Sequence, residues 1–245
     1  MFEEIKVSSY VALLIFAALY LGGSSIQFMF LFFKRNTLSL QILCGGFLLG
    51  LFTFDLLPEA FSRFNIIGIL TGISIGIFIM ILMEVFLHKN RFLHKYHEDT
   101  MYLLFLALLI HSIPTGMTFG MSLQAGQAIN YGLLLAFILH NVPEGMMIMA
   151  SIPLIKGKNK LFTFFCTAFS IVIGINILIG LNMRVDSTKW NTVIMGITIG
   201  TMGYVAFYEF LWKKSKYLSK GRVALYVILG MVGMHLFLRF IPSHH

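Results

Sequence analysis

The sequence contains few charged residues and few cysteines. Asp, Glu, Lys and Arg together make up 11% of its 245 residues, whereas a soluble domain carries about 25%. Hydrophobic residues reach 58% and the mean hydropathy is +0.86, which is more apolar surface than a water-soluble chain of this length could bury. Cys44 and Cys166 both lie in apolar runs, which argues against a disulfide framework. The composition therefore predicts a membrane protein.

Two common sequence signals are also missing. The N-terminal stretch MFEEIKVSSYVALL has no basic n-region and no small-residue cleavage site, so we expect the first apolar run to be a retained helix. The chain contains no phosphate-binding GxxxxGK[ST] motif, which argues against ATP-driven pumping by this chain itself.

Eight apolar runs are each long enough to cross a bilayer, which takes roughly 20 residues. The connections between them are short and carry nearly all the charge, so we predict one all-α transmembrane domain over residues 1–245 and no soluble domain. The expected helices cover about residues 10–33, 39–61, 66–87, 101–122, 131–154, 162–182, 191–212 and 223–241.

The basic residues predict the orientation of these helices. With the N-terminus outside, 13 of the 18 Lys and Arg fall on the inside, among them Lys89, Lys220 and Arg222, and five fall outside. Basic loops favour the cytoplasmic side, so we expect a multi-pass protein of the cell membrane with both termini outside. This loop bias also explains the net charge of +8 without a nucleic-acid partner.

Two similar segments stand out within the apolar runs: HSIPTG at residues 111–116 and HNVPEG at residues 140–145. Imidazole and carboxylate groups are costly inside a bilayer and usually line a path or a site. Pro114 and Pro143 also remove helix hydrogen bonds, and broken backbone at membrane depth is tolerated only inside protein or along a cavity. Together the two segments predict one shared intramembrane site.

Helix geometry brings the two segments to the same depth. His111 lies 15 residues before the centre of the connecting loop at Gly126, and His140 lies 14 residues after it. At 1.5 Å per residue the two depths differ by only a few Å, and positions i, i+1 and i+4 of a helix project to one side. The facing stripes are His111, Ser112 and Thr115 on one helix, and His140, Asn141 and Glu144 on the other. Histidine with glutamate suits zinc, iron, manganese or cobalt.

These segments resemble the signatures of the ZIP (Zrt/Irt-like) metal transporters, and most closely their bacterial GufA-like branch. HNVPEG is similar to the family's fifth-helix motif, and HSIPTG stands where the fourth helix carries a related one. FDLLPEA at 54–60 and GYVAFYE at 203–209 resemble the ends of its second and seventh helices. The resemblance implies a 3+2+3 arrangement, in which helices 1–3 and 6–8 form an inverted repeat around helices 4 and 5. It also implies alternating access, in which a bundle that holds the site moves against a scaffold.

The sequence departs from the family pattern in its acids. The family's fourth helix usually has an acid where this chain has Thr115 and an Asn where it has Ser112, and a glutamate of the sixth helix is missing. Two dications beside Glu144 alone would leave uncompensated charge in a low-dielectric site. We therefore expect one ion instead of the family's two, held by His111, His140 and Glu144 with help from Asn141 and Ser112.

Four further polar residues are candidates for the ion pathway. Asp55 and Glu59, one turn apart near the outer end of the second helix, form either an entrance relay or a pair of ordinary interfacial acids. Thr115 belongs to the site stripe. Glu209, near the inner end of the seventh helix, lies either on the pathway or in a simple i, i+4 pair with Lys213.

The expected function is transport of a divalent metal ion, with zinc the first choice and iron, manganese or cadmium as alternatives. We expect no enzyme activity and no organic cofactor, and we expect membrane lipid and the metal ion, but no nucleic acid, as partners. Two other functions stay open: a non-transporting, sensor-like member of the family, and an intramembrane metalloenzyme. The Gly-rich helix faces permit close packing within one chain or between two copies, so a homodimer also stays open.

Overall fold

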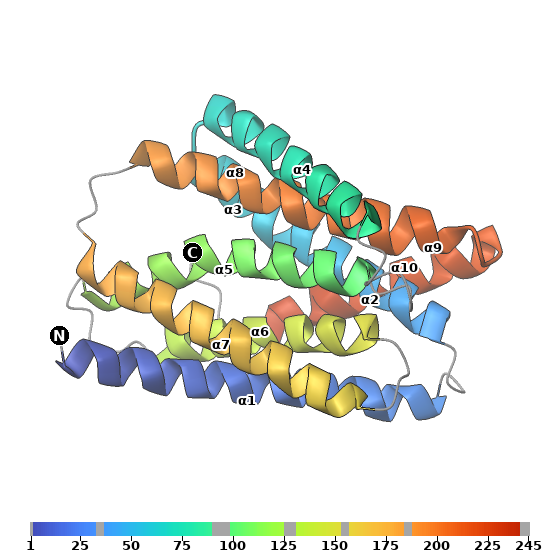
Figure 1. Ribbon diagram of the computed structural model, residues 1–245, viewed down its shortest axis with the longest axis horizontal. Coiled ribbons are helices and arrows are strands. Elements are labelled where there is room, and N and C mark those ends of the chain that lie inside the picture. Colours follow the sequence, from blue (N-terminus) through green and yellow to red (C-terminus); the bar gives the residue numbers. More distant parts are fainter. Residues whose placement is uncertain are drawn as a thin grey trace.

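The computed structural model describes residues 2–32, 37–89, 99–124, 131–152, 157–183 and 188–240. Within these ranges the chain is helical and has no strand, which confirms the all-α prediction (Figure 1). The elements are α1 (Phe2–Phe32), α2 (Thr37–Leu51), η1 (Phe52–Leu56), α3 (Leu57–Arg63), α4 (Ile66–Lys89), α5 (Asp99–Gln124), α6 (Tyr131–Ser151), α7 (Lys158–Asn182), α8 (Thr188–Tyr204), η2 (Val205–Trp212), α9 (Lys213–Ser215) and α10 (Lys220–Phe240).

Two of the long helices contain a π-helical segment. In η1 the amide of Leu57 donates to the carbonyl of Phe52, five residues back, and α2, η1 and α3 continue as one rod. In η2 the amide of Lys213 donates to the carbonyl of Tyr208 in the same way, and it joins α8 to α9. Such segments often occur at functional sites.

The helix boundaries agree with the expected spans to within a few residues, except at the N-terminus. Helix α1 begins at Phe2, ahead of the apolar run, because a helix can extend beyond the membrane. Glu3 and Glu4 in its first turn favour the positive end of the helix dipole. Among the described helices, seven are long and apolar enough to cross a membrane. The long helix α6, with 21 residues, is not among these seven. The full count of eight spans therefore stays a prediction.

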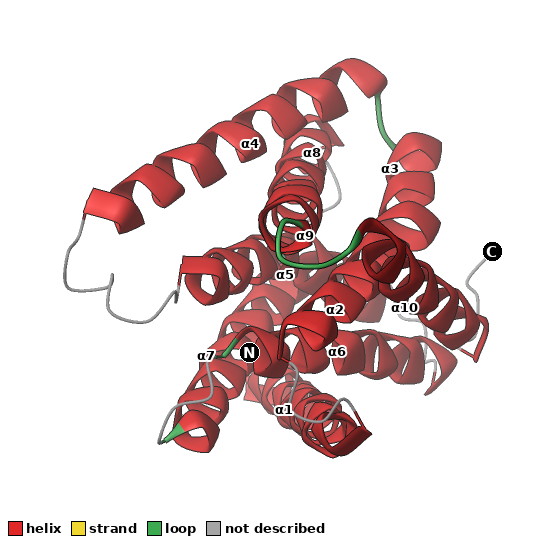
Figure 2. Ribbon diagram, turned by 90° about the vertical axis from the view of Figure 1, so that its right-hand side faces the viewer, coloured by secondary structure: helices red, strands yellow, loops and turns green. Residues whose placement is uncertain are grey.

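The helices are arranged in two groups of four. The most extensive helix contacts pair α1 with α6, α5 with α7, α2 with α10, and α4 with α8. Helices α1, α5, α6 and α7 are called the first unit here, because α7 contacts α1, α5 and α6, and α6 contacts α1 and α5. The rods that contain α2 and α8 form the second unit together with α4 and α10. Figure 2 shows α4 and α8 on one side of the molecule and α1 and α7 on the other, with α2 and α5 between them.

Glycines allow the paired helices to approach closely. A Cβ added at Gly196 of α8 would lie 2.4 Å from the carbonyl oxygen of Ile69 in α4, and one at Gly180 of α7 would lie 2.2 Å from that of Met117 in α5. No side chain fits at such distances, so only glycine permits this backbone contact. The close packing at these glycines therefore takes place within the chain.

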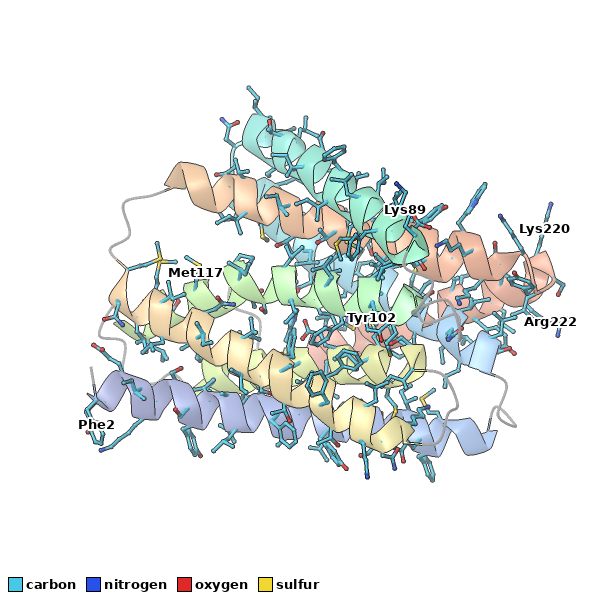
Figure 3. The ribbon with its side chains drawn as sticks, viewed as in Figure 1. Phe2, Lys89, Tyr102, Met117, Lys220 and Arg222 are labelled. Carbon is cyan, nitrogen blue, oxygen red and sulfur yellow. The ribbon has the colours of Figure 1, made fainter. Side chains whose placement is uncertain are left out.

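Three of the basic residues predicted to share one membrane face lie toward the same end of the molecule. Lys89 at the end of α4 lies toward the same end as Lys220 and Arg222 at the start of α10, and Phe2 lies at the opposite end (Figure 3). Side chains fill the space between the helices, and Phe105 of α5, for example, packs against Phe165 of α7 with ring centroids 4.5 Å apart.

Candidate metal centre

The two Pro-Gly segments lie on α5 and α6, and both helices continue through their prolines. Pro114 and Pro143 have no amide hydrogen to give to the carbonyl four residues earlier, which lies next to His111 and His140 respectively. The backbone around each histidine therefore lacks one helix hydrogen bond. Both interrupted segments lie inside the helix bundle, where such backbone was expected to be tolerated.

Three side-chain atoms of these helices form a small triangle. His111 Nε2 lies 3.3 Å from His140 Nε2 and 3.4 Å from Glu144 Oε1, and His140 Nε2 lies 4.0 Å from the same oxygen. A point equidistant from the three atoms is about 2.1 Å from each of them, which equals the ~2.0–2.2 Å of zinc–imidazole and zinc–carboxylate bonds. This is the only group of three or more His, Cys, Asp or Glu in the described part of the chain with metal-ligand spacing.

The triangle is enclosed by protein. His111 is 3% exposed and Glu144 is 1% exposed. Several polar atoms here have no hydrogen-bond partner among the described residues, namely His111 Nδ1, Asn141 Oδ1 and Glu144 Oε2. Burying an unpaired polar atom costs free energy, so a cluster of such atoms needs an explanation. A cation at the triangle would account for the unpaired oxygens of Glu144 and Asn141 but not for His111 Nδ1, because that ring faces the triangle through Nε2.

The other residues predicted for the site already have partners in its helices. Ser112 Oγ donates to the carbonyl of Leu109 at 2.7 Å and accepts from Asn176 Nδ2 of α7 at 3.3 Å. Thr115 Oγ1 donates to the carbonyl of His111 at 2.8 Å. Asn141 Nδ2 donates to its own helix at 2.7 Å, which leaves its Oδ1 as the atom available to a ligand. Asn176 was not among the residues that the sequence predicted for the site.

Asp55 lies near His140 and belongs to η1, in the rod formed by α2, η1 and α3. Its Oδ2 lies 3.6 Å from His140 Nδ1, and the Asp55 side chain is 35% exposed. The sequence left Asp55 as either part of an entrance relay or an interfacial acid, and it did not predict this contact with a histidine of α6. Glu59 belongs to α3, one turn further along, and its side chain lies outside the part of the structure that is described.

Glu209 lies in a separate, buried cluster near one end of the bundle. Its carboxylate accepts from Lys213 Nζ at 2.5 Å and from Thr100 Oγ1 of α5 at 2.8 Å. Lys213 also donates to Glu84 of α4 at 2.6 Å, and the Tyr204 hydroxyl donates to Glu84 as well. The i, i+4 pair with Lys213 that the sequence allowed is therefore present, and its ammonium group balances one of the two carboxylates.

A comparison with protein-family models matches residues 91–238 to the ZIP zinc transporter family. The match covers more than half of the sequence and includes both Pro-Gly segments. The chain belongs to the ZIP family. A search of curated proteins gave no match.

Membership of the ZIP family agrees with the resemblance found in the sequence. ZIP proteins carry divalent metal ions, so the family and the long apolar helices together indicate a multi-pass membrane protein of a metal-transporter family. Because it is a transporter family, membership also fits the expectation that the chain is not an enzyme. Its place in the GufA-like branch stays a prediction.

Proposed function

We propose that this ZIP protein carries one divalent metal ion at a time across the membrane, through a site between α5 and α6. His111 Nε2, His140 Nε2 and Glu144 Oε1 hold the ion, and Asn141 and Ser112 assist. The observation that carries the proposal is the spacing of these three atoms, whose equidistant point lies about 2.1 Å from each. Burial of His111 and Glu144 and the unpaired oxygens Glu144 Oε2 and Asn141 Oδ1 add independent support.

The donor atoms favour zinc over the hard cations. Calcium takes six to eight oxygen ligands at about 2.3–2.6 Å, and magnesium prefers octahedral oxygen sites. Two imidazole nitrogens with one carboxylate oxygen instead suit zinc and its transition-metal neighbours. Zinc usually has four ligands, so three protein ligands leave a fourth position for a water molecule. This water can be exchanged as the ion enters and leaves the site.

The charges near the site favour one ion. A dication beside the carboxylates of Glu144 and Asp55 gives a net charge of 2 − 1 − 1 = 0. A second dication would leave two positive charges uncompensated in a buried site, which is costly. Thr115 offers no third carboxylate, and its hydroxyl donates to its own helix.

The packing of the helices supports the proposed 3+2+3 inverted repeat. The eight predicted helices correspond in order to α1, the α2–η1–α3 rod, α4, α5, α6, α7, the α8–η2–α9 rod and α10. Exchanging helices 1, 2 and 3 with helices 6, 7 and 8, and helix 4 with helix 5, converts the α1–α6 pair into the α7–α5 pair. The same exchange converts the α2–α10 pair into the α8–α4 pair. The π-helical segments also correspond, because η1 lies in helix 2 and η2 in helix 7. In this proposal eight spans leave both termini outside, and the first unit moves against the second.

Uptake into proteoliposomes tests the proposal. The purified protein is reconstituted into vesicles, and zinc, iron, manganese, cadmium, calcium and magnesium are added outside in turn. The metal content of the washed vesicles is then measured for each ion. We expect uptake of zinc, little or none of calcium or magnesium, and loss of uptake in His140→Gln. His235→Gln is the matched control, because the ring of His235 in α10 packs against that of Phe54, with centroids 4.8 Å apart, and is not part of the triangle.

Each alternative function gives a different result in the same experiment. A sensor-like protein binds zinc through His140 but gives no uptake, and a metalloenzyme likewise moves no ion. Uptake at the same rate in His140→Gln and wild type contradicts the site, because the ion then crosses elsewhere.

A further inference from the structure

Asp55 approaches the ring edge of His140 that faces away from the metal triangle. Its Oδ2 lies 3.6 Å from Nδ1, whereas Nε2 of the same ring faces His111 and Glu144. A single metal ion bound to Nε2 therefore cannot be bound through Nδ1 as well. Asp55 acts on the ion through the histidine and not as a ligand in this arrangement.

A carboxylate at this place has a defined chemical effect. A neutral imidazole carries one hydrogen, and a carboxylate that accepts from Nδ1–H keeps that hydrogen on Nδ1 and leaves the lone pair of Nε2 for the metal. It also orients the ring and increases the electron donation of Nε2. The distance of 3.6 Å closes to a hydrogen bond with a small side-chain movement. Loss of such partners typically weakens metal binding about 10–100-fold.

The two residues belong to different units of the fold. Asp55 lies in the π-helical segment η1 of the second unit, and His140 lies in α6 of the first. Helix α6 packs chiefly on α1, and the rod that contains η1 packs chiefly on α10, with a smaller contact between α2 and α6. A displacement of one unit along the other would separate Asp55 from His140, while the three metal-binding atoms would move together on α5 and α6.

We propose that Asp55 is a positioning residue that orients His140 for metal binding, and that the site binds its ion tightly only while the two units keep this contact. The inference rests on the proposed transport function and adds a way to alternate between loading and release. The ion loads while the carboxylate holds the ring, and it leaves more easily once the units have shifted and the contact is broken.

Metal affinity and the histidine tautomer test this role in the purified protein in detergent. Co²⁺ is titrated and followed by its visible absorption, and side-chain ¹⁵N spectra of histidine-labelled protein report which nitrogen of His140 carries hydrogen. For Asp55→Ala we expect a Kd for Co²⁺ about 10–100-fold higher and a mixture of tautomers. Asp55→Asn should lie in between, because its amide oxygen still accepts, and it serves if the alanine variant fails to fold. Thr53→Val is the control, because Thr53 lies in the same segment and donates to Leu49 of its own helix.

Transport kinetics distinguish positioning from a general structural role. Asp55→Ala should raise the KM for zinc uptake by the same factor without lowering the maximal rate, because loading weakens while release becomes easier. An unchanged Kd and tautomer, or a lower maximal rate at unchanged KM, overturns the role of Asp55. If wild type and His140→Gln bind Co²⁺ equally, the proposed site itself has failed, and that result is separate from the outcome for Asp55.

Discussion

Replacing Glu144 by Gln removes the buried carboxylate of the metal triangle and keeps the size and the carbonyl oxygen of the side chain. Glu144 is 1% exposed, and its Oε1 lies 3.4 Å from His111 Nε2. An ion at the equidistant point would lie about 2.1 Å from this oxygen. At an effective dielectric constant of about 20, the gross attraction between a dication and a carboxylate at that distance is roughly 16 kcal/mol.

Most of that attraction is offset by the water that both groups lose on binding. Removal of one partner of a buried charge pair costs about 3–5 kcal/mol in practice. At about 1.4 kcal/mol per factor of ten, the Kd for zinc should rise by roughly 10²–10³·⁵. We take a tenfold rise as the smallest result that agrees with this reasoning.

Zinc-dependent thermal stabilisation and proteoliposome uptake measure the effect. At a zinc concentration of 100 times its Kd, binding stabilises wild type by about 2.7 kcal/mol, whereas a variant with a 100-fold higher Kd gains only about 0.4 kcal/mol. Uptake at low zinc should fall at least tenfold. Glu209→Gln is the matched control for the affinity measurement, because Glu209 is equally buried and bonds to Lys213 and Thr100 instead. It should lower stability without changing the Kd, and wild-type affinity and uptake in Glu144→Gln would refute the assignment of the site.

Four other predictions concern topology, stoichiometry and packing. Single cysteines at Lys158 and Gln127, introduced into a cysteine-free background, should react with impermeant reagents from the inside and the outside respectively; labelling from the same face would contradict the topology. Crystals soaked in zinc or cadmium should give one dominant anomalous peak between the two site histidines, and two well-occupied peaks within about 4–5 Å of each other would exclude a one-ion site. Thr115→Glu should raise affinity or admit a second ion, and unchanged binding would mean that charge does not set the stoichiometry. Gly196→Leu should lower the free energy of unfolding by about 1–3 kcal/mol, because its Cβ would lie 2.4 Å from a carbonyl oxygen of α4. Gly221→Ala is the control, because no atom lies within 4 Å of the added Cβ. Equal melting temperatures for the two variants would contradict the close packing.

The sequence was sufficient for the helices and for the family. Runs of apolar residues identify membrane helices because a span needs a fixed length and the lipid excludes charge. The motifs at residues 111–116 and 140–145 identified the ZIP family, because a histidine, a proline and a glycine at fixed spacing inside a membrane helix form a distinctive pattern. Their similar depth also follows from helix rise alone, since α5 and α6 are joined by a short connection.

Only the tertiary structure decided which helix faces meet. A membrane helix is apolar on nearly all sides, and lipid is about as apolar as the protein interior, so hydrophobic periodicity does not distinguish a buried face from a lipid-facing one. Phe78 of α4 is 61% exposed and Phe169 of α7 is fully buried, yet both lie in runs of similar composition. For the same reason, the sequence did not indicate that Gly196 packs on α4.

The contact between Asp55 and His140 likewise depended on the fold. It requires a particular rotation of the α2–η1–α3 rod about its own axis and a particular register of α6 against that rod, for two residues that are far apart in the sequence. The sequence determined which chemical groups enter the membrane, because each carries its own cost of leaving water. The tertiary structure determined which of them face one another, because helix rotation and register are set by side-chain packing between helices and not by any single helix.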